Sequence, residues 1–475
     1  MTRLAEVEIQ PRSLARFRDV LPPELWSHVE QGAGQGREAF AGRTLWNVNS
    51  TARGGGVAEM LLPLLTYARS AEVDARWLVI GGDEPFFRVT KRIHNRLHGA
   101  DGDGGPLGAA ERTDYEATLR ANGEELAARV GPRDCVILHD PQTAGLVPAV
   151  KATGAPVIWR CHVGLDTPNE LAREAWRFLA GYVREADACV FSRRAFVWED
   201  LEDERIAVIA PSIDAFAPKN QPLAPGAVEA ILGAAGVREN GADPVAARFM
   251  RMDGTADRVA RRAHAVEARP LRSGERFVLQ VSRWDRLKDP TGVIAGFADH
   301  VAGATDAHLV YAGPAVEAVS DDPEGRAVLE DARRQWHALD APVRERVHLA
   351  LLPMEDGEEN AAIVNALQRA ADVVVQKSLA EGFGLTVAEA MWKARPVVAS
   401  RIGGIQDQIE DGRSGVLLDD PSDRAAYGAA VTALLRDRPR AAQMGAAAEE
   451  RVRERFLGTH SLLDYLELVG PLLTP

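Results

Sequence analysis

Residues 372–400 read DVVVQKSLAEGFGLTVAEAMWKARPVVAS. The run DVVVQ predicts a short buried strand, and PVVA near the end of the stretch predicts a second one. Between them, the loop EGFG leads into a helix that we expect to begin near Leu385. A strand, a loop, a helix and a second strand form the repeating unit of an α/β fold, in which ligands bind at the carboxyl ends of parallel strands.

The loop in this stretch has the features of a binding site. Glu381 and Glu389 stand eight residues apart and frame Gly382-Phe383-Gly384. Glycines let the backbone approach a ligand closely, and the first N–H groups of the following helix attract an anion. Glu389 shares a helix face with Leu385, where a carboxylate can accept hydrogen bonds from a ribose diol. The alternative is an ordinary crossover with a surface acid at each end, but the paired acids around Gly-Phe-Gly favour binding.

The same alternation of apolar runs and helical segments extends over most of the chain and predicts an α/β fold class with two doubly wound domains. The first series of predicted strands is 44–49, 75–80, 135–138, 156–159, 188–191 and 206–209. The second series is 277–281, 307–311, 347–352, 372–376 and 396–399. We expect an N-terminal extension at 1–43, a first domain at 44–215, a connection without regular strands at 216–274, a second domain at 275–455, and nearly continuous helix from 441 to 473.

Composition indicates a soluble globular protein and excludes some classes of partner. With 475 residues, 46% hydrophobic and 26% charged, the chain is long enough for at least two cores. The net charge of −13 argues against a general nucleic-acid binder, and no uninterrupted apolar stretch is long enough to predict a membrane span. Three scattered cysteines and an N-terminus without a signal-peptide core favour the cytoplasm.

Two cations follow the first strand of the second series. The stretch from Ser282 to Pro290 reads SRWDRLKDP and places Arg283 and Lys288 on one loop at a strand end. An arginine that binds in a bidentate manner and a compact lysine suit a diphosphate. Solvated surface charges are the alternative, although the position at the carboxyl end of a strand favours binding.

A glycine-rich loop follows the first strand of the first series. Residues 49–59 read NSTARGGGVAE, which suggests backbone approach to a phosphate or a sugar. The loop matches neither G-x-G-x-x-G nor a Walker motif, so dehydrogenase and P-loop functions lose support. A tight turn is the alternative here, as it is for Gly403-Gly404, which would otherwise approach the nucleotide.

Two further strand ends of the first domain carry polar residues. His139-Asp140 ends one predicted strand, and Arg160-Cys161-His162 ends the next. A histidine with internal partners and an aspartate in a turn are the structural alternatives. Because both groups stand at successive strand ends, we expect His162 and Asp140 to face a ligand.

The order of these motifs resembles the retaining glycosyltransferases of family four, which have the GT-B fold, and is most similar to the branch of glycosyltransferring trehalose synthases. The resemblance spans most of residues 44–460. It is carried by WNVNSTARGGGVAE, ARWLVIGGDEPFFRVTKRIHN, HDPQ, IWRCH, APSIDAFAPKN, QVSRWDRLKD, DDPEG and EGFGLTVAEAMWK. It implies two Rossmann-like domains that face a central cleft, and a C-terminal helix, 456–475, that crosses back to the first domain.

The resemblance also assigns roles to residues. Catalytic roles would fall to His162, Arg283, Lys288 and Glu381. The donor would contact Gly55, Gly56, Gly382, Phe383, Gly384, Leu385, Thr386 and Glu389. The acceptor would contact Asn49, Asp140 and Arg160.

The implied reaction moves glucose from a nucleoside diphosphate-glucose, with UDP-, ADP- and GDP-glucose as candidates, to free glucose, and gives trehalose with retained configuration. The sequence predicts no metal ligands and no obligatory cofactor, because Arg283 and Lys288 supply positive charge and no Asp-x-Asp pair stands at a strand end. A phosphorylase, a transferase with another acceptor and a silent sugar-nucleotide-binding homologue are the alternatives. The oligomeric state stays open, with a homodimer as one candidate.

Overall fold

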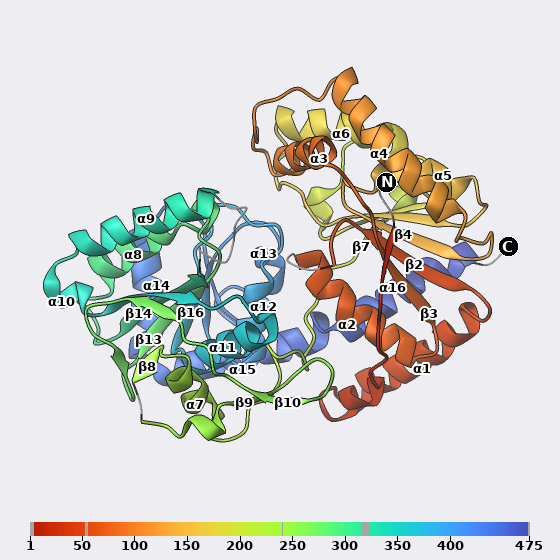
Figure 1. Cartoon of the computed structure of the whole chain (residues 1–475). Coiled ribbons are helices and arrows are strands. Elements are labelled where there is room, and N and C mark those ends of the chain that lie inside the picture. Colours follow the sequence, from red (N-terminus) through yellow and green to blue (C-terminus); the bar gives the residue numbers. More distant parts are fainter. Residues whose placement is uncertain (1–3, 53–55, 240, 316–322, 474–475) are drawn as a thin grey trace. The chain divides into compact units, whose positions relative to one another are not determined.

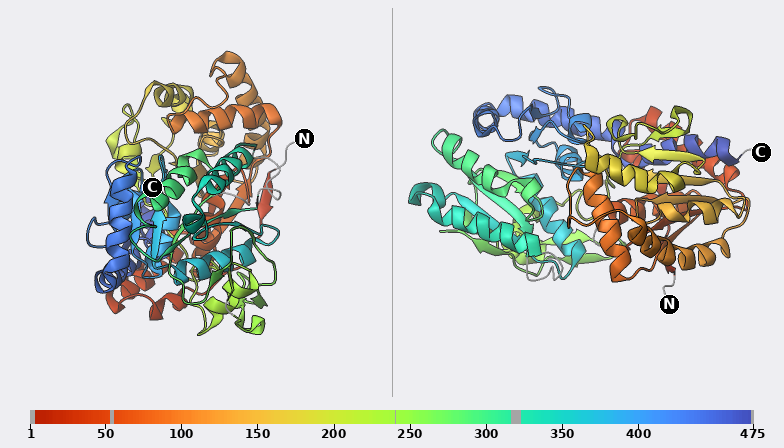
Figure 2. Two further views of the ribbon diagram at one scale, coloured as in Figure 1. Left: turned by 90° about the vertical axis from the view of Figure 1, so that its left-hand side faces the viewer. Right: turned by 90° about the horizontal axis from the view of Figure 1, so that it is seen from above.

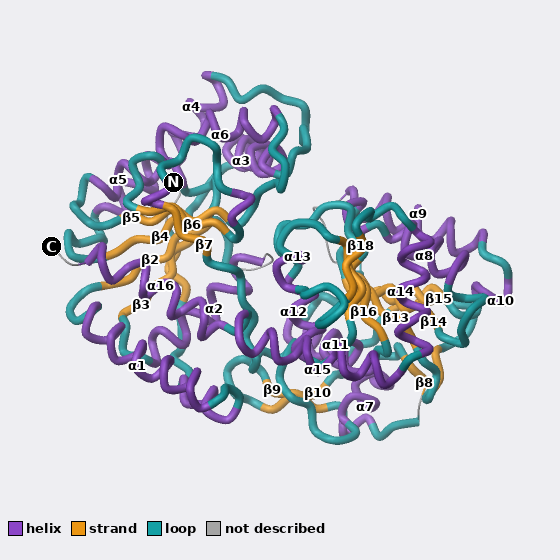
Figure 3. Tube along the Cα trace, turned by 180° about the vertical axis from the view of Figure 1, so that it is seen from behind, coloured by secondary structure: helices purple, strands orange, loops and turns teal. Residues whose placement is uncertain are grey.

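The chain forms two compact units in a computed structural model that describes residues 4–52, 56–239, 241–315 and 323–473. Unit 1 comprises Met1–Ser212 together with Phe456–Pro475, and unit 2 comprises Ile213–Arg455. Figure 1 follows the chain through the two units by colour. Figure 3 shows that strands lie at the centre of each unit and that helices surround them.

The sheet of unit 1 has, within the described ranges, seven strands in the order β1-β3-β2-β4-β5-β6-β7. All neighbours are parallel except β1, which runs antiparallel to β3. The strands are β1 (Ala5–Val7), β2 (Thr44–Asn49), β3 (Asp74–Val79), β4 (Cys135–His139), β5 (Val157–Cys161), β6 (Ala188–Phe191) and β7 (Ile206–Val208). The main helices are α1 (Pro23–Ala39), α2 (Gly56–Ser70), α3 (Glu84–Leu97), α4 (Ala109–Ala127), α5 (Val147–Lys151), α6 (Glu170–Val183) and α16 (Gly458–Leu473).

Both faces of this sheet are buried, which explains why its strands read as continuous apolar runs. In β4, Val136 and Leu138 belong to the core shared with α3, α4, α5 and α6. Cys135 and Ile137 point to the opposite face and belong to the core shared with α2 and α16. Because successive side chains of a strand alternate between faces, every residue of such a strand must be apolar unless its polar groups find partners.

The sheet of unit 2 contains, among the described residues, seven strands in the order β11-β15-β14-β13-β16-β17-β18, and β11 alone is antiparallel. They are β11 (His264–Val266), β13 (Phe277–Val281), β14 (His308–Pro314), β15 (Val347–Leu352), β16 (Val373–Gln376), β17 (Val397–Ser400) and β18 (Val416–Leu418). The helices are α7 (Ala227–Ala234), α8 (Pro290–His300), α9 (Pro323–Ala338), α10 (Ala341–Arg344), α11 (Gly357–Ala370), α12 (Leu385–Trp392), α13 (Ile405–Gln408), α14 (Arg424–Arg436) and α15 (Arg438–Arg455).

Short strands account for the main differences from the sequence prediction. Residues 5–7 add β1 to the edge of the first sheet, although 1–43 was expected to be an extension outside the first domain. The expectation of no regular strand at 216–274 was wrong, because β11 extends the second sheet there. Two small two-stranded sheets also form in that stretch, from β8 (Arg238–Glu239) with β12 (Leu271–Arg272) and from β9 (Arg248–Met250) with β10 (Ala256–Arg258). Strands of two or three partly exposed residues produce no apolar run for a sequence pattern to detect.

The end of the described chain is helical, as expected, but it is divided. Helix α15 ends at Arg455 in unit 2, and α16 begins at Gly458 and packs against α1 and α2 of unit 1. The two further views in Figure 2 show α16 beside the sheet of unit 1. None of the helices in the described ranges has the length and apolar character that a bilayer crossing requires.

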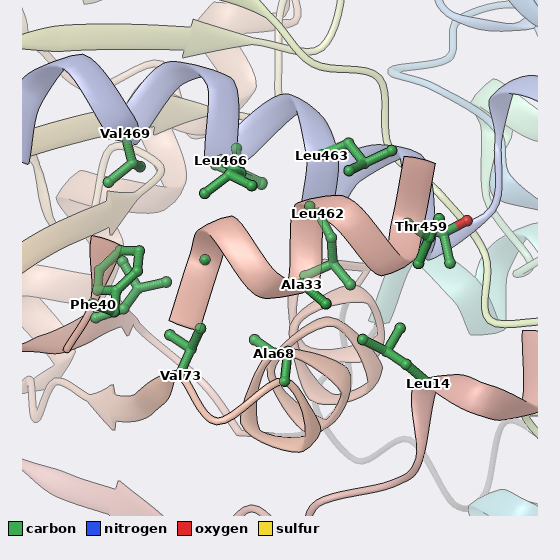
Figure 4. A pocket seen from close by; sticks show the side chains of 16 residues that line it. Leu14, Ala33, Phe40, Ala68, Val73, Thr459, Leu462, Leu463, Leu466 and Val469 are labelled. Carbon is green, nitrogen blue, oxygen red and sulfur yellow. The ribbon is translucent and has the colours of Figure 1, made fainter. Parts of the chain in front are cut away.

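Helix α16 leaves a small apolar cavity of about 80 Å³ where it meets α1 (Figure 4). Apolar side chains such as Phe40, Leu466 and Val469 line it. The close approach of the two helices depends on glycine in α1, because a Cβ at Gly32 would lie 2.4 Å from Leu463 Cδ2. A Cβ at Gly34, two residues further along, would meet nothing within 4 Å.

This difference predicts that two matched substitutions in α1 change the stability by different amounts. Gly34→Ala should raise the free energy of unfolding by about 0.5–1 kcal/mol, because alanine loses less backbone entropy than glycine in a helix. Gly32→Ala gains the same helix propensity but must displace Leu463, so its thermal midpoint should fall below that of Gly34→Ala. Differential scanning calorimetry of both variants measures this, and equal midpoints would show that α16 does not pack tightly at Gly32.

Candidate functional site

An ion pair at the carboxyl ends of the unit 2 strands joins Lys288 to Glu381. Lys288 ends the short 3₁₀ helix Arg286–Lys288 after β13, and Glu381 lies in the loop between β16 and α12. Lys288 Nζ lies 2.6 Å from Glu381 Oε2, and the hydroxyl of Ser378 donates to the same oxygen at 3.2 Å. Both side chains of the ion pair are largely buried, at 15% and 13% exposure.

The backbone on either side of Lys288 is fixed by buried polar groups. Gln280 of β13 is fully buried and donates its amide to the carbonyl of Lys288 at 2.8 Å. Asp289 adopts a left-handed conformation with φ 48°, and its carboxylate accepts the N–H of Gly292 at the start of α8 at 3.0 Å. Lys377, at the exit of β16, forms an ion pair with Asp289. The loop that carries Lys288 is therefore held by the two central strands of the sheet.

Arg283 lies on the same loop but remains at the surface. Its side chain is 70% exposed, and its guanidinium lies 3.4 Å from Asp285. An exposed pair of this kind contributes little stability. The structure thus brings Lys288 to Glu381 and leaves Arg283 accessible to an anion.

The loop from Glu381 to Thr386 takes the form that its glycines allow. Gly384 has φ 79° and stands immediately before α12. The side chain of Phe383 is buried at 7% exposure, so this residue offers a ligand its backbone rather than its ring. Thr386 donates its hydroxyl to Gln376 of β16 at 3.1 Å, which ties the first turn of α12 to the sheet.

Gly403 and Gly404 pack directly against this loop. A Cβ at Gly403 would lie 1.9 Å from the carbonyl oxygen of Glu381, and a Cβ at Gly404 would lie 2.3 Å from the ring of Phe383. The N–H of Gly404 donates to the carbonyl of Gly382 at 2.8 Å. These glycines form a turn, and that turn supports the conformation of the Glu381 loop.

Glu389 lies apart from the Lys288 pair, one turn into α12, and is 4% exposed. Lys219 Nζ lies 3.5 Å from its Oε1, while its Oε2 is buried with no hydrogen-bond partner among the described residues. Lys393 is buried beneath it and donates to the backbone carbonyl of Glu389 and to Asn220 Oδ1, each at 2.9 Å. Burial lowers the pKa of Lys393 well below its usual value. A carboxylate with one unpaired oxygen can still accept hydrogen bonds from hydroxyl groups.

The sequence pattern did not single out Lys219 or Ser378. Lys219 comes from the stretch that follows Ile213, and α11 holds that stretch through Asn365, whose amide donates to the carbonyls of Pro218 and Gln221, each at 2.9 Å. Lys219 belongs to the stretch APSIDAFAPKN, but no role was assigned to it, because its position beside Glu389 depends on this tertiary contact. Ser378 had a weak signal, as part of the polar exit of a buried strand.

Only part of the glycine-rich loop of unit 1 belongs to the described residues. Gly55, assigned to donor binding, lies outside the described residues, while Gly56 begins α2 and has open space beside its Cα. Asn49, assigned to the acceptor, is buried: its oxygen accepts the indole N–H of Trp77 at 2.8 Å and its amide donates to the carbonyl of Thr51 at 2.7 Å. Asn49 therefore anchors the start of the loop, and its contact with an acceptor stays a prediction.

Asp140 is a half-buried residue in a strained backbone conformation directly after β4. It has φ 65°, and its Oδ1 accepts the backbone N–H of His162 at 2.8 Å. Burial raises the pKa of Asp140 to about 6, against the lowering effects of the His162 N–H and the charge of Arg160. The carboxylate therefore titrates close to neutral pH, and residues held in this way concentrate at functional sites.

Arg160 lies near the end of β5 and His162 directly follows that strand, and the two side chains contact each other. Arg160 is 1% exposed, donates to the carbonyl of Ile209 at 3.0 Å and lies over the ring of Tyr465 in α16 at 5.5 Å. Its Nε lies 3.1 Å from His162 Nε2, and His139 Nδ1 lies 3.1 Å from the same nitrogen. These residues stand at successive strand ends in the sequence, and the structure shows that they contact one another. Arg160 is enclosed by protein, and its contact with an acceptor stays a prediction.

The chain contains no candidate metal centre in its described part, where no three His, Cys, Asp or Glu side chains converge. The cysteines Cys135, Cys161 and Cys189 are buried free thiols.

Two family models match this chain in succession. The model "Trehalose synthase, N-terminal domain" matches residues 47–198, and the model "Glycosyl transferases group 1" matches residues 262–451. The first match lies in unit 1 and contains Asp140 and His162. The second lies in unit 2 and contains Lys288, Glu381 and Glu389.

Individual proteins are similar over much or all of the chain. A trehalose synthase of Rubrobacter xylanophilus is 36% identical over 97% of both chains. A trehalose phosphorylase of Pleurotus pulmonarius is 24% identical over 87% of this chain and 55% of that protein. Among solved structures, a UDP-forming α,α-trehalose-phosphate synthase of Burkholderia xenovorans has a TM-score of 0.67 at 14% identity, over 91% of this chain and 100% of that one. This last likeness concerns the fold, and it confirms the predicted GT-B class.

The raised pKa of Asp140 predicts a pH-dependent stability difference for Asp140→Asn. The folded-state pKa of about 6 exceeds the ordinary value of 3.8, so ionisation disfavours the folded state increasingly as pH rises from about 4 to 6. Asparagine tolerates the left-handed backbone and keeps an acceptor for the His162 N–H. The variant should therefore gain stability across that window, up to about 3 kcal/mol, and keep the gain at higher pH.

Thermal midpoints of both proteins from pH 4 to pH 8 measure this gain. Asp203→Asn, which makes the same substitution at an aspartate with 72% exposure, serves as the control. A difference for Asp140→Asn that does not change with pH would contradict the raised pKa.

Proposed function

This chain belongs to the trehalose synthase family of GT-B glycosyltransferases, and we propose that it transfers glucose from a nucleoside diphosphate-glucose to free glucose and forms trehalose with retained configuration. In this proposal unit 2 binds the donor. Unit 1 contributes the acceptor residues, with Asp140 as the first candidate.

The observation that carries the proposal is the contact between Lys288 and Glu381, which are 93 residues apart in sequence. The two loops that hold them follow the central strands β13 and β16, where ligands of open α/β sheets bind. A lysine at this place, with the exposed Arg283 on the same loop, suits the diphosphate of a donor. A carboxylate beside them suits the hydroxyl groups of the transferred sugar.

The side chains support the following transfer. The bond between the anomeric carbon and the diphosphate oxygen breaks, and negative charge develops on that oxygen. Lys288 and Arg283 stabilise this charge, together with the amino-terminal end of α12. The acceptor hydroxyl attacks on the face that the diphosphate leaves, its oxygen bonds to the anomeric carbon, and its proton passes to the departing phosphate. No covalent glycosyl-enzyme forms on Glu381, which binds sugar hydroxyls in this scheme.

Glu389 is proposed to hold the ribose of the donor. Its buried Oε2 has no hydrogen-bond partner in the described chain, and a ribose diol can donate to a carboxylate. Lys219, 3.5 Å from the other oxygen, adds a third cation to the donor side. We propose that these cations replace a divalent metal ion in charge stabilisation, so that the reaction needs no metal and no other cofactor.

A retaining trehalose phosphorylase is the second candidate, favoured by the similarity to the Pleurotus pulmonarius protein. Arg283 and Lys288 would bind inorganic phosphate as readily as a diphosphate. The unpaired Glu389 Oε2 favours the first candidate, because a reaction with inorganic phosphate brings no ribose to this carboxylate.

A substrate panel tests the proposed function directly. UDP-, ADP- and GDP-glucose are each incubated with glucose or with glucose 6-phosphate, with and without EDTA, and the products are identified by mass spectrometry and NMR. We expect trehalose from glucose and at least one donor, unaffected by EDTA. Glucose release from trehalose only in the presence of inorganic phosphate, with no product from any nucleotide sugar, would establish the phosphorylase instead.

Lys288→Met should lower kcat about 10²–10³-fold, because it removes a fixed cation that stabilises the leaving diphosphate. Arg286→Met is the matched control: it removes a cation from the same 3₁₀ helix, but that side chain is 65% exposed and lies 3.9 Å from Asp331. Steady-state kinetics of both variants provide the comparison. Equal losses would mean that the net charge of the loop matters rather than the position of Lys288.

A further inference from the structure

Four side chains of unit 1 form a continuous hydrogen-bonded chain in the order Arg160, His162, His139 and Asn47. Arg160 lies within β5 and His162 follows it, His139 ends β4, and Asn47 lies within β2, so the hydrogen-bonded chain crosses three neighbouring strands. Asn47, His139 and Arg160 are 2%, 1% and 1% exposed. His139 Nε2 lies 3.0 Å from Asn47 Oδ1, and the two imidazole rings stack with centroids 5.4 Å apart.

The two histidines of this hydrogen-bonded chain, His139 and His162, are neutral. Burial lowers the pKa of His139 to about 3, and burial together with the charge of Arg160 lowers the pKa of His162 well below its ordinary value. A neutral imidazole has one N–H donor and one acceptor nitrogen. The direction of each hydrogen bond in the chain can therefore be derived once one end is fixed.

Arg160 fixes that end, because a guanidinium only donates. If Arg160 Nε donates to His162 Nδ1, at 3.3 Å, then His162 Nε2–H donates to His139 Nδ1, at 3.1 Å. His139 Nε2–H then donates to Asn47 Oδ1, and each ring nitrogen has one partner. The opposite order would direct two donors, Arg160 Nε and His139 Nδ1–H, at the single lone pair of His162 Nε2, and would turn His162 Nδ1–H towards a guanidinium that cannot accept.

Surrounding contacts hold His162 and Arg160 of this hydrogen-bonded chain in place. The backbone N–H of His162 donates to Asp140 Oδ1 at 2.8 Å. Arg160 is fixed by the carbonyl of Ile209 and by the ring of Tyr465. His162 itself is only partly buried, whereas the side chains behind it are fully enclosed. The arrangement presents one half-buried ring on an enclosed polar support.

We propose that Asn47 and His139 are positioning residues, which hold His162 as its Nε2–H tautomer and in one orientation beside the transferred sugar. The proposal rests on the proposed function, in which His162 lies near the donor sugar. It assigns His162 a role as a fixed neutral group, so His162 takes up no proton during the reaction. Its two ring nitrogens are both engaged within the protein.

Three substitutions of His139 separate positioning from packing. Asparagine places its amide oxygen near the position of Nδ1 and can still accept from His162 Nε2–H. Glutamine places its amide near the position of Nε2, where it reaches Asn47 instead of His162. Leucine of similar size makes neither bond.

We expect His139→Asn to keep kcat within about fivefold of the wild type, and His139→Gln and His139→Leu to lower kcat about 10–100-fold with the donor KM little changed. Calorimetry establishes that each variant folds. Equal losses in all three, or better activity with glutamine than with asparagine, would overturn the proposal.

A spectroscopic measurement tests the tautomer without turnover. In the full-length protein labelled with ¹⁵N-histidine and assigned by single substitution, His162 should show a protonated Nε2 and an unprotonated Nδ1 at pH 7. His139→Leu should replace this signature by a mixture of tautomers. A wild-type His162 with its proton on Nδ1, or with a positive charge, would overturn the proposal. Because no substrate is present, inactivity towards every nucleotide sugar would count against the proposed function alone, and this spectrum would still decide the hydrogen-bonded chain.

Discussion

A parallel sheet covered on both faces confines polar chemistry to the ends of its strands. In unit 1, adjacent residues of β4 belong to opposite apolar cores, so polar groups within the strand are costly unless they bond to one another. The same architecture in unit 2 leaves the exits of β13 and β16 as the place where Lys288 and Glu381 meet. The residues assigned to substrate in this protein therefore lie at the last positions of a strand, in the loop that follows it, or in the first turns of the next helix.

The electrostatics of the two units differ in a way that suits different ligands. The Lys288 and Glu381 pair is mutually neutralised, and Arg283 and Lys219 add positive charge around it. Such a surface favours an anionic ligand. In unit 1, by contrast, burial keeps both histidines uncharged and brings the pKa of Asp140 to about 6. A nearly neutral set of hydrogen-bonding groups is suited to an uncharged sugar.

Much of this arrangement could be predicted from the sequence, because burial on both faces produces apolar runs and the polar residue after each run marks its exit. Strand β2 was predicted with its observed bounds, and so were β6, β13 and β15. Glu381, Lys288, Asp140 and His162 all stand at such exits.

What could not be predicted depends on contacts between distant segments. The position of Lys219 depends on the contact of its stretch with α11. Asn47 is a polar residue within the strand TLWNVN, and the strand pattern does not indicate that it contacts His139. Strands β1 and β11 form because a longer strand offers an edge, and their own three residues carry no pattern.

Unit 1 is assembled from two segments that are far apart in the chain. Ser461 of α16 bonds to Ser212, 249 residues earlier, and α16 supplies Tyr465, Val469 and Leu473 to one of the two cores. During synthesis on the ribosome, which adds about 5–20 residues per second, residues 1–212 must wait on the order of tens of seconds for this helix. Until it arrives, one face of the first sheet has α2 but lacks α16, and Arg160 lacks the ring of Tyr465 on which it rests. Unit 2, whose segment is continuous, can fold first although it is made second. Connectivity thus makes the completion of unit 1 depend on the last residues of the chain to be synthesised.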